Sequence, residues 1–308
     1  EGGLILNRSN FIMQPGEALQ LENFEPDISG GYRRISGFRK YVNAVVPQTS
    51  SSSESLLMIA NFDNKVLAAR GEKIFSSASA ELSIAIAADT SMTGSGTITV
   101  PSTLGFSSSG NLQINSEIFT YTGKTSTNFT GVTRAVSSTA AAHAKLDVVS
   151  ESWTVRDTGR TSAAKYHFER YNFDGNEKII CVDGVNAPVI FNTSMTAADV
   201  SDSSVAGATV VAAYRNHMFY GGKSTTPQEV VFSEPFDEDG FTSGQGAGSI
   251  KVDDTVVALK VFRDSLFIFC ENRIFKLTGS TSSDFSVQPV TRNIGCINSF
   301  TVQEFAGD

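Results

Sequence analysis

The sequence predicts an all-β protein: a β-propeller with at least four recognisable blades, interrupted by a small inserted β module. Three observations predict this fold: a repeated strand pair, a recurring order of strands and turns, and one segment of different composition. Residues 210–220 line up with residues 258–268, and both contain an aromatic residue followed by arginine and then Asn or Asp. Repeats of about 40–50 residues made of strands and turns are typical of propeller blades.

The composition argues against several classes of protein. The 308 residues carry a net charge of −8, whereas a protein that coats nucleic acid needs a basic surface. Cys181 and Cys270 lie in apolar strand patterns, which favours buried free thiols over a disulfide. The scattered histidines have no zinc-binding spacing, and no stretch is long and apolar enough to cross a membrane. We therefore expect no cofactor, no metal and no membrane insertion.

The chain divides into four parts in sequence order. An N-terminal arm covers residues 1–46, and part of a first propeller blade covers residues 47–79. An inserted module occupies residues 80–150, and the remaining blades occupy residues 151–308, with the last blade either complete or cut short. Such insertions enter through loops, because the entropy of closing a loop grows slowly with its length. We expect the arm to pack along the propeller or along a neighbouring molecule.

The blades are predicted from a recurring order of apolar strand, turn, apolar strand, turn and short strand. The first copy begins at residues 56–60 and resumes after the insertion at residues 152–156. Further copies cover about 164–192, 208–233 and 256–290, and a fifth is expected to open at 299–302.

The inserted module differs from the blades in being rich in Ser, Thr, Gly and Ala. Short strands are expected within it at residues 97–100, 112–114, 117–121 and 129–132. We expect the module to lie on the outside of the propeller, where it leaves the blade cores intact.

The opening of the chain combines Gly-Gly pairs, a turn and a basic aromatic stretch. The residues concerned are Gly2, Gly3, Leu4, Pro15, Gly16, Glu17, Ala18, Asn23, Phe24, Asp27, Gly30, Gly31, Tyr32, Arg33, Arg34, Gly37 and Phe38. This pattern resembles the N-terminal segment of the tail nozzle (tail tubular) proteins of short-tailed bacteriophages, in which such a motif leads into a β-propeller. Ser36 stands where that family commonly has proline.

The inserted module is similar to small β modules that are repeated across phage virion proteins, through residues 101–110, 117–123, 129–135 and 141–143. Together the resemblances imply a structural protein of the virion tail: a ring-forming, nozzle-like subunit that extends the DNA conduit and supports fibre docking. The partners they imply are copies of the chain in a ring, with six as a candidate number, and adjacent tail adaptor and fibre proteins. Genomic DNA would pass transiently during ejection.

Four basic residues of the arm are candidate functional residues: Arg33, Arg34, Arg39 and Lys40. They could contact DNA in a channel, pair with acidic groups of a neighbouring subunit, or simply lie in solvent. The acidic net charge favours the last two, because a conduit that must release DNA should not bind it tightly. Arg215 and Arg263 recur at equivalent blade positions, and we expect them to bridge strand ends.

The sequence contains no recognisable catalytic motif, and we expect the protein not to be an enzyme. Asp237-Glu238-Asp239-Gly240 resembles the start of a calcium loop but lacks its terminal Glu, so a solvated acidic turn is expected. Glycosidases need two carboxylates flanking the sugar, and none can be paired from the sequence. The alternatives are a host-surface (glycan) binding fibre or spike protein, a neck or baseplate component of a contractile-tailed phage, and a polysaccharide-cleaving enzyme.

Overall fold

The computed structural model describes residues 22–26, 32–35, 37, 39–43, 47, 54–162 and 165–304. The chain divides into two compact units, Glu1–Tyr41 and Val42–Asp308. In the first unit, a hairpin pairs β1 (Phe24–Pro26) with β2 (Tyr32–Arg34), and Arg33 donates a hydrogen bond to Glu25. The motif residues at 2–18, 27, 30–31, 36 and 38 lie outside the described residues.

The second unit contains four antiparallel sheets of four strands, which we call blades 1 to 4. Blade 1 consists of β3 (Leu56–Phe62), β4 (Lys65–Arg70), β5 (Lys73–Ser77) and β13 (Thr154–Asp157). Blade 2 consists of β14 (His167–Asn172), β15 (Glu177–Val182), β16 (Val189–Asn192) and β17 (Ala197–Asp199). Blade 3 consists of β18 (Val210–Tyr214), β19 (His217–Gly221), β20 (Glu229–Phe232) and β21 (Gly248–Lys251). Blade 4 consists of β22 (Val256–Phe262), β23 (Ser265–Cys270), β24 (Ile274–Thr278) and β25 (Ser286–Thr291).

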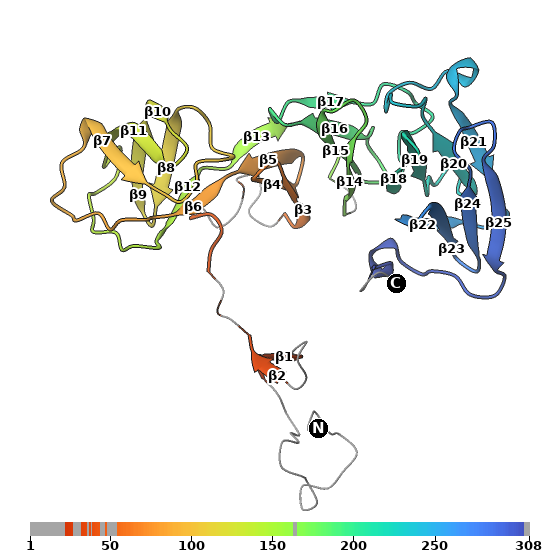
Figure 1. Cartoon of the computed structure of the whole chain (residues 1–308), viewed down its shortest axis with the longest axis horizontal. Helices are drawn as coiled ribbons and strands as arrows, with labels where there is room; N and C mark the ends of the chain where they lie inside the picture. The colour runs from red at the N-terminus through yellow and green to blue at the C-terminus, as the bar shows by residue number, and fades with distance from the viewer. Residues whose placement is uncertain are drawn as a thin grey trace, which may run out of the picture. The chain divides into compact units, whose positions relative to one another are not determined.

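The first strands of the blades lie side by side. Strand β3 lies next to β14, β14 next to β18, and β18 next to β22, so the blades follow one another in chain order (Figure 1). Four-stranded meanders whose first strands lie side by side are the arrangement of a β-propeller, in which the blades surround a central channel. The predicted all-β propeller with at least four blades is therefore confirmed.

Neighbouring blades are held together by apolar side chains that alternate between the two faces of each sheet. In blade 2, Ile179 and Phe191 pack against blade 1, whereas Ile180 and Ile190 pack against blade 3. Blade 3 likewise buries one face against blade 2 and places Phe219 in the core that it shares with blade 4. Both faces of the two middle blades are thus buried, which explains the apolar runs in β15, β16, β18 and β19.

The inserted module is a separate sheet between the third and fourth strands of blade 1. Its strands are β6 (Ser79–Glu81), β7 (Thr93–Thr99), β8 (Gly110–Ile114), β9 (Glu117–Tyr121), β10 (Gly123–Lys124), β11 (Asn128–Thr133) and β12 (Val148–Glu151). They enclose a core of their own, which includes Phe119 and Phe129. The chain enters and leaves the module at one place, because the Glu151 amide donates to the Ala78 carbonyl oxygen at 3.0 Å. Strand β13 therefore pairs with β5 and completes blade 1. The sequence predicted that this blade resumes after the insertion.

The repeated aromatic-arginine motif forms hairpin turns. Arg215 and Asn216 have positive φ angles of 51° and 63°, and Arg263 has a φ of 53°, conformations that short hairpin turns require. The guanidinium carbon of Arg215 lies 5.5 Å from the centroid of the Tyr214 ring, and that of Arg263 lies 5.0 Å from the Phe262 ring. Each arginine thus packs on the aromatic residue that precedes it, and the expected bridge between strand ends stays a prediction.

The segment after blade 4 does not open a fifth strand. Residues Ser299–Thr301 form a short 3₁₀ helix, η3, whose start is capped by the Asn298 side chain accepting from the Phe300 amide. This cap satisfies an amide that a strand would have paired, so the predicted strand at residues 299–302 is wrong. Within the described residues, no helix is long and apolar enough to cross a membrane.

A buried carboxylate organises the inserted module. Glu117 is fully buried and accepts two hydrogen bonds from Arg134, both at 2.8 Å. It also accepts from the backbone amides of Ala135 and Ala141 and lies 2.9 Å from Nε2 of His143. Burial acts to raise the pKa of Glu117, but these hydrogen bonds outweigh it and lower the pKa from 4.5 to about 2.

We predict that Glu117→Gln lowers the free energy of unfolding by about 3–5 kcal/mol, because it leaves Arg134 buried without its charge partner. The measurement is chemical denaturation followed by the fluorescence of Trp153, the single tryptophan. Because the folded pKa is depressed, this stabilisation is present above pH 4.5 and is lost as the pH falls towards 2. The exposed control Glu177→Gln should change stability little, and equal effects of the two variants would contradict the prediction.

Candidate functional site

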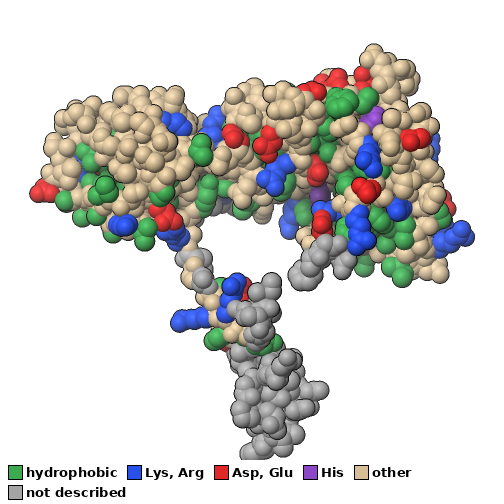
Figure 2. Space-filling model, in the orientation of Figure 1, with side chains coloured by type: hydrophobic (Ala, Val, Ile, Leu, Met, Phe, Trp, Pro, Cys, Tyr) green, Lys and Arg blue, Asp and Glu red, His purple; other side chains and the backbone are tan. Residues whose placement is uncertain are grey.

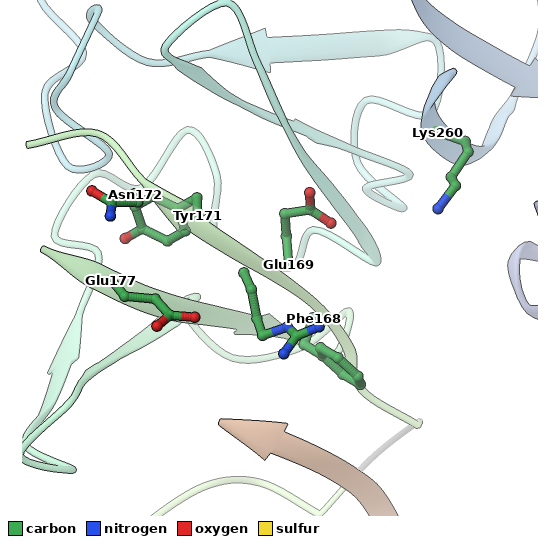
Figure 3. A pocket seen from close by; sticks show the side chains of 7 residues that line it. Phe168, Glu169, Tyr171, Asn172, Glu177 and Lys260 are labelled. Atoms are coloured by element: carbon green, nitrogen blue, oxygen red, sulfur yellow. The ribbon is translucent and has the colours of Figure 1, made fainter. Parts of the chain in front are cut away.

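The inner edge of blade 2 borders a pocket of about 760 Å³ (Figure 3). Most of its lining comes from β14 and from the first residue of β15, and Lys260 on β22 of blade 4 completes it. The lining residues are Phe168, Glu169, Arg170, Tyr171, Asn172, Glu177 and Lys260. Because β14 is the first strand of its sheet, the pocket lies where the first strands of the blades meet, the region in which propellers have their central channel.

The alternation of β14 distributes charge to both sides of the pocket. Glu169 pairs with Ile180 of β15, which faces blade 3, whereas Arg170 pairs with Ile179, which faces blade 1. Cross-strand partners share a face, so these two charged residues point to opposite faces of the sheet. The pocket therefore presents acidic and basic groups on different sides of one strand.

Glu169 has the most perturbed environment of the charged residues in the pocket. Burial raises the pKa of its carboxyl group, while the positive charge of Lys260 and a hydrogen bond from the Ala213 backbone oppose the rise. Ala213 belongs to β18, the strand next to β14. Glu169 is thus held between the first strands of blades 2, 3 and 4.

The two carboxylates of the pocket do not form a glycosidase pair. Glu177 lies opposite Asn172 in the register of β14 and β15, three residues along β14 from Glu169. At about 3.3 Å per residue this is a separation of roughly 10 Å along the strand, and alternation directs the two side chains to opposite faces. Glycosidases need their carboxyl groups about 5–9.5 Å apart across one sugar. The arrangement suits hydrogen bonding to a polar surface better than acid–base chemistry.

The acidic turn that follows β20, the third strand of blade 3, links blade 3 to blade 2. Glu238 is only 6% exposed, and its carboxylate is paired with Lys178 of blade 2. Its backbone oxygen accepts a hydrogen bond from the Tyr220 hydroxyl at 2.9 Å, and Asp239 accepts from Ser201. The solvated turn expected from the sequence is therefore wrong for Glu238, which connects blades 2 and 3. No group of three or more His, Cys, Asp or Glu in the described part of the chain could hold a metal ion.

The four basic residues singled out in the sequence belong to the first unit and are exposed. Arg33 and Arg34 lie on β2, where Nε of Arg33 is 2.7 Å from a carboxylate oxygen of Glu25. Arg39 and Lys40 follow the hairpin outside any strand. Whether they contact DNA, a neighbouring subunit or solvent stays a prediction.

Sequence reasoning missed the residues of the pocket. Glu169, Arg170 and Lys260 sit inside strands that it treated only as parts of blades. One signal was present: β14 reads His-Phe-Glu-Arg-Tyr-Asn, which is far more polar than the other strands of blade 2. Polar residues in the first strand of a blade are expected where that strand borders the central channel of a propeller.

Comparison with known proteins found no matching family model and no matching curated protein. Among solved structures, the chain is similar to BBS1N from its complex with ARL6DN, at 9% identity and a TM-score of 0.29 over 78% of this chain and 68% of that one. It is also similar to Sqt1 of Saccharomyces cerevisiae, at 11% identity and a TM-score of 0.32 over 76% of this chain. The match covers 60% of Sqt1, so the chain spans less than two thirds of that protein.

We predict that Lys260→Met raises the pKa of Glu169 further above its ordinary value, because it removes the positive charge that opposes the effect of burial. The measurement is a pH titration of the glutamate carboxyl signals by ¹³C NMR. Lys276→Met, which removes a lysine two strands away on β24, is the matched control and should leave the pKa of Glu169 unchanged. An unchanged value in the Lys260 variant would contradict the arrangement of the pocket.

Proposed function

We propose that the chain is a structural subunit of a bacteriophage tail, a nozzle-like protein that forms a ring, extends the DNA conduit and supports fibre docking. The observation that carries the proposal is the order of parts along the chain. A Gly-Gly and basic aromatic motif resembling that of tail nozzle proteins precedes a β-propeller, and the propeller is interrupted by a module similar to those of virion proteins.

The rigidity of the blades supports a structural role. Three apolar cores tie blades 1 to 4 together in sequence, and interiors of this kind transmit force with little deformation. The thiols of Cys181 and Cys270 are buried, and burial raises the pKa of each. Neither is therefore an activated nucleophile, which fits the proposal that the protein is not an enzyme.

The attachment of the inserted module supports the docking role. Asn43 donates from its side chain to the carbonyl oxygens of Gln113 and Val148, at 2.6 and 2.8 Å. Lys65 of blade 1 donates to the Gly105 carbonyl oxygen and lies 3.7 Å from the Glu151 carboxylate. The module is therefore fixed to blade 1 through Lys65 and to the segment before blade 1 through Asn43, as a platform that carries a fibre would have to be.

The charge of the chain fits a conduit that lets DNA pass. The net charge is −8, so the long-range field repels a polyanion and disfavours tight binding. In the pocket at the inner edge, the acidic Glu169 and Glu177 balance the basic Arg170 and Lys260. A phosphate backbone would find no continuous basic track there.

The proposal is tested by electron microscopy of intact virions labelled with an antibody against residues 85–145, which belong to the inserted module. We expect label confined to the tail, with rotational symmetry in averaged images. Virions from which the tails have been removed are the control and should carry no label.

Label along fibres would contradict the nozzle role and favour the host-surface binding alternative. Label on the capsid would also contradict it, and would favour a decoration role. Label at the neck or baseplate of a contractile tail would agree with a tail protein but would contradict the nozzle role.

A further inference from the structure

After β25 the chain returns to the inner edge of the propeller. The Cys296 amide donates to the Cys270 carbonyl oxygen, at the end of β23, at 2.8 Å. From there the chain runs towards β14 and β22, the first strands of blades 2 and 4, and forms η3 (Figure 1). We call residues 299–304 the strap.

His167, the first residue of β14, holds the strap to blade 2. Its Nε2 lies 2.6 Å from the hydroxyl oxygen of Ser299. Its ring stacks on the Phe300 ring, with centroids 4.2 Å apart and an angle of 23° between the planes. The ammonium nitrogen of Lys165, two residues before His167, lies 5.7 Å from the centroid of the same Phe300 ring. The strap therefore contacts blade 2 where a titratable imidazole and a lysine share one aromatic ring.

The strap also lies against blade 4. Residues 302–304 form one wall of a cavity of about 290 Å³, and Lys260 and Phe262 of β22 contribute to its other walls. Hydrophobic side chains are visible at the surface over this blade (Figure 2). Because Lys260 also lines the pocket at the inner edge of blade 2, the strap lies beside that pocket.

The strap lies on the surface and not in a core. All of residues 299–304 are described by the structure, and none of them belongs to an apolar core. Phe300 is 45% exposed although it stacks on His167. Segments with few buried apolar contacts open at a low cost in free energy. We therefore expect that loss of the His167 contact is enough to release the strap.

We propose that the strap is released by protonation: it lies on β14 while His167 is neutral and leaves β14 when the imidazole gains a proton. Histidine is the side chain that ordinarily changes its charge between about pH 5 and 8. A proton on His167 would place a second positive charge beside the Phe300 ring, close to Lys165, in a half-buried position where a charge is poorly solvated. Release would open the cavity that residues 302–304 close on one side.

The direction of the pKa shift of His167 agrees with this behaviour. Burial lowers the pKa of its imidazole from 6.5, so the neutral form is favoured while the strap is in place. Because the pKa is depressed, the stabilisation of the contact is present above pH 6.5 and is lost as the pH falls through the lowered pKa.

The other charged groups near His167 do not set this direction, because burial is the cause of the shift. Glu169, on the same face of β14, interacts with the Ala213 backbone and with Lys260. Asp183 follows Val182, the cross-strand partner of His167, so it points to the other face, where it accepts from backbone amides. Strand β18 carries no charged residue. The charged residues on the elements around His167 are thus Lys165, Glu169, Asp183, Lys260 and Glu304.

The first test measures the reciprocal effect of the strap on the proton. Phe300→Ala should raise the pKa of His167 towards 6.5, because a contact that protonation weakens must in turn disfavour the proton. The measurement is an NMR titration of the imidazole signals of the three histidines. Ile297→Ala is the matched control, since Ile297 is 99% exposed just before the strap, and it should leave the pKa unchanged. An unchanged pKa of His167 in the Phe300 variant would overturn the proposal.

The second test follows the strap itself by hydrogen exchange of the whole chain at about pH 7.5 and about pH 5. After correction for the intrinsic exchange rate, peptides that cover residues 299–304 should lose protection at the lower pH. His167→Phe keeps an aromatic ring but takes up no proton, so its strap should stay protected at both pH values. Equal protection at both pH values in the unaltered protein would overturn the proposal, and so would an equal loss in the His167 variant.

If His167→Phe fails to fold, the titration of Phe300→Ala still decides the question. The release rests on contacts within one copy of the chain, so its failure would leave the proposed tail function standing.

Discussion

The structure depends on the packing of one blade against the next. A four-stranded sheet with apolar residues on both sides exposes hydrophobic surface to water unless each face is covered, and burial of that surface is the main favourable contribution to folding. In blades 2 and 3 both faces are covered, so even the small residue Ala212 is buried. The turns, the pocket and the insertion occupy positions that this stacking leaves available.

The stacking explains why polar residues occur where they do. The apolar faces leave two places for polar groups: the inner edge, where Glu169 and Lys260 line a pocket, and the connections between blades, where Glu238 is paired with Lys178. The buried carboxylate of Glu238 is tolerated because Lys178 pairs with it. On blade 4, Phe267 and Phe269 line a cavity together with residues 302–304, which follow the last strand of the blade.

The inserted module shows how a second core can be added without disturbing the first. Its entry and exit strands, β6 and β12, pair with each other. For blade 1 the insertion is therefore only a longer connection between β5 and β13. Inside the module, Glu117 makes five hydrogen-bonding contacts with four residues of the segment that follows β11, which fixes a long irregular segment with one carboxylate. The module is therefore stabilised mainly by its own apolar core.

The sequence by itself determined the strands, their meander order and the place of the insertion, because these depend on local alternation and on turn residues such as Asn216 at positive φ. The sequence also identified the two repeated segments, residues 210–220 and 258–268, in which an arginine packs on the aromatic ring that precedes it. Only the tertiary structure decided which side chains meet across blades: Glu169 lies near Lys260 because β14 lies next to β18, and β18 lies next to β22. Residues 299–302 were expected to be a strand, yet Ser299–Thr301 form a short 3₁₀ helix whose start is capped by Asn298. Contacts between segments that are distant in the sequence formed the candidate site, and a single capping side chain decided the structure after blade 4. Neither can be read from the local periodicity of the sequence.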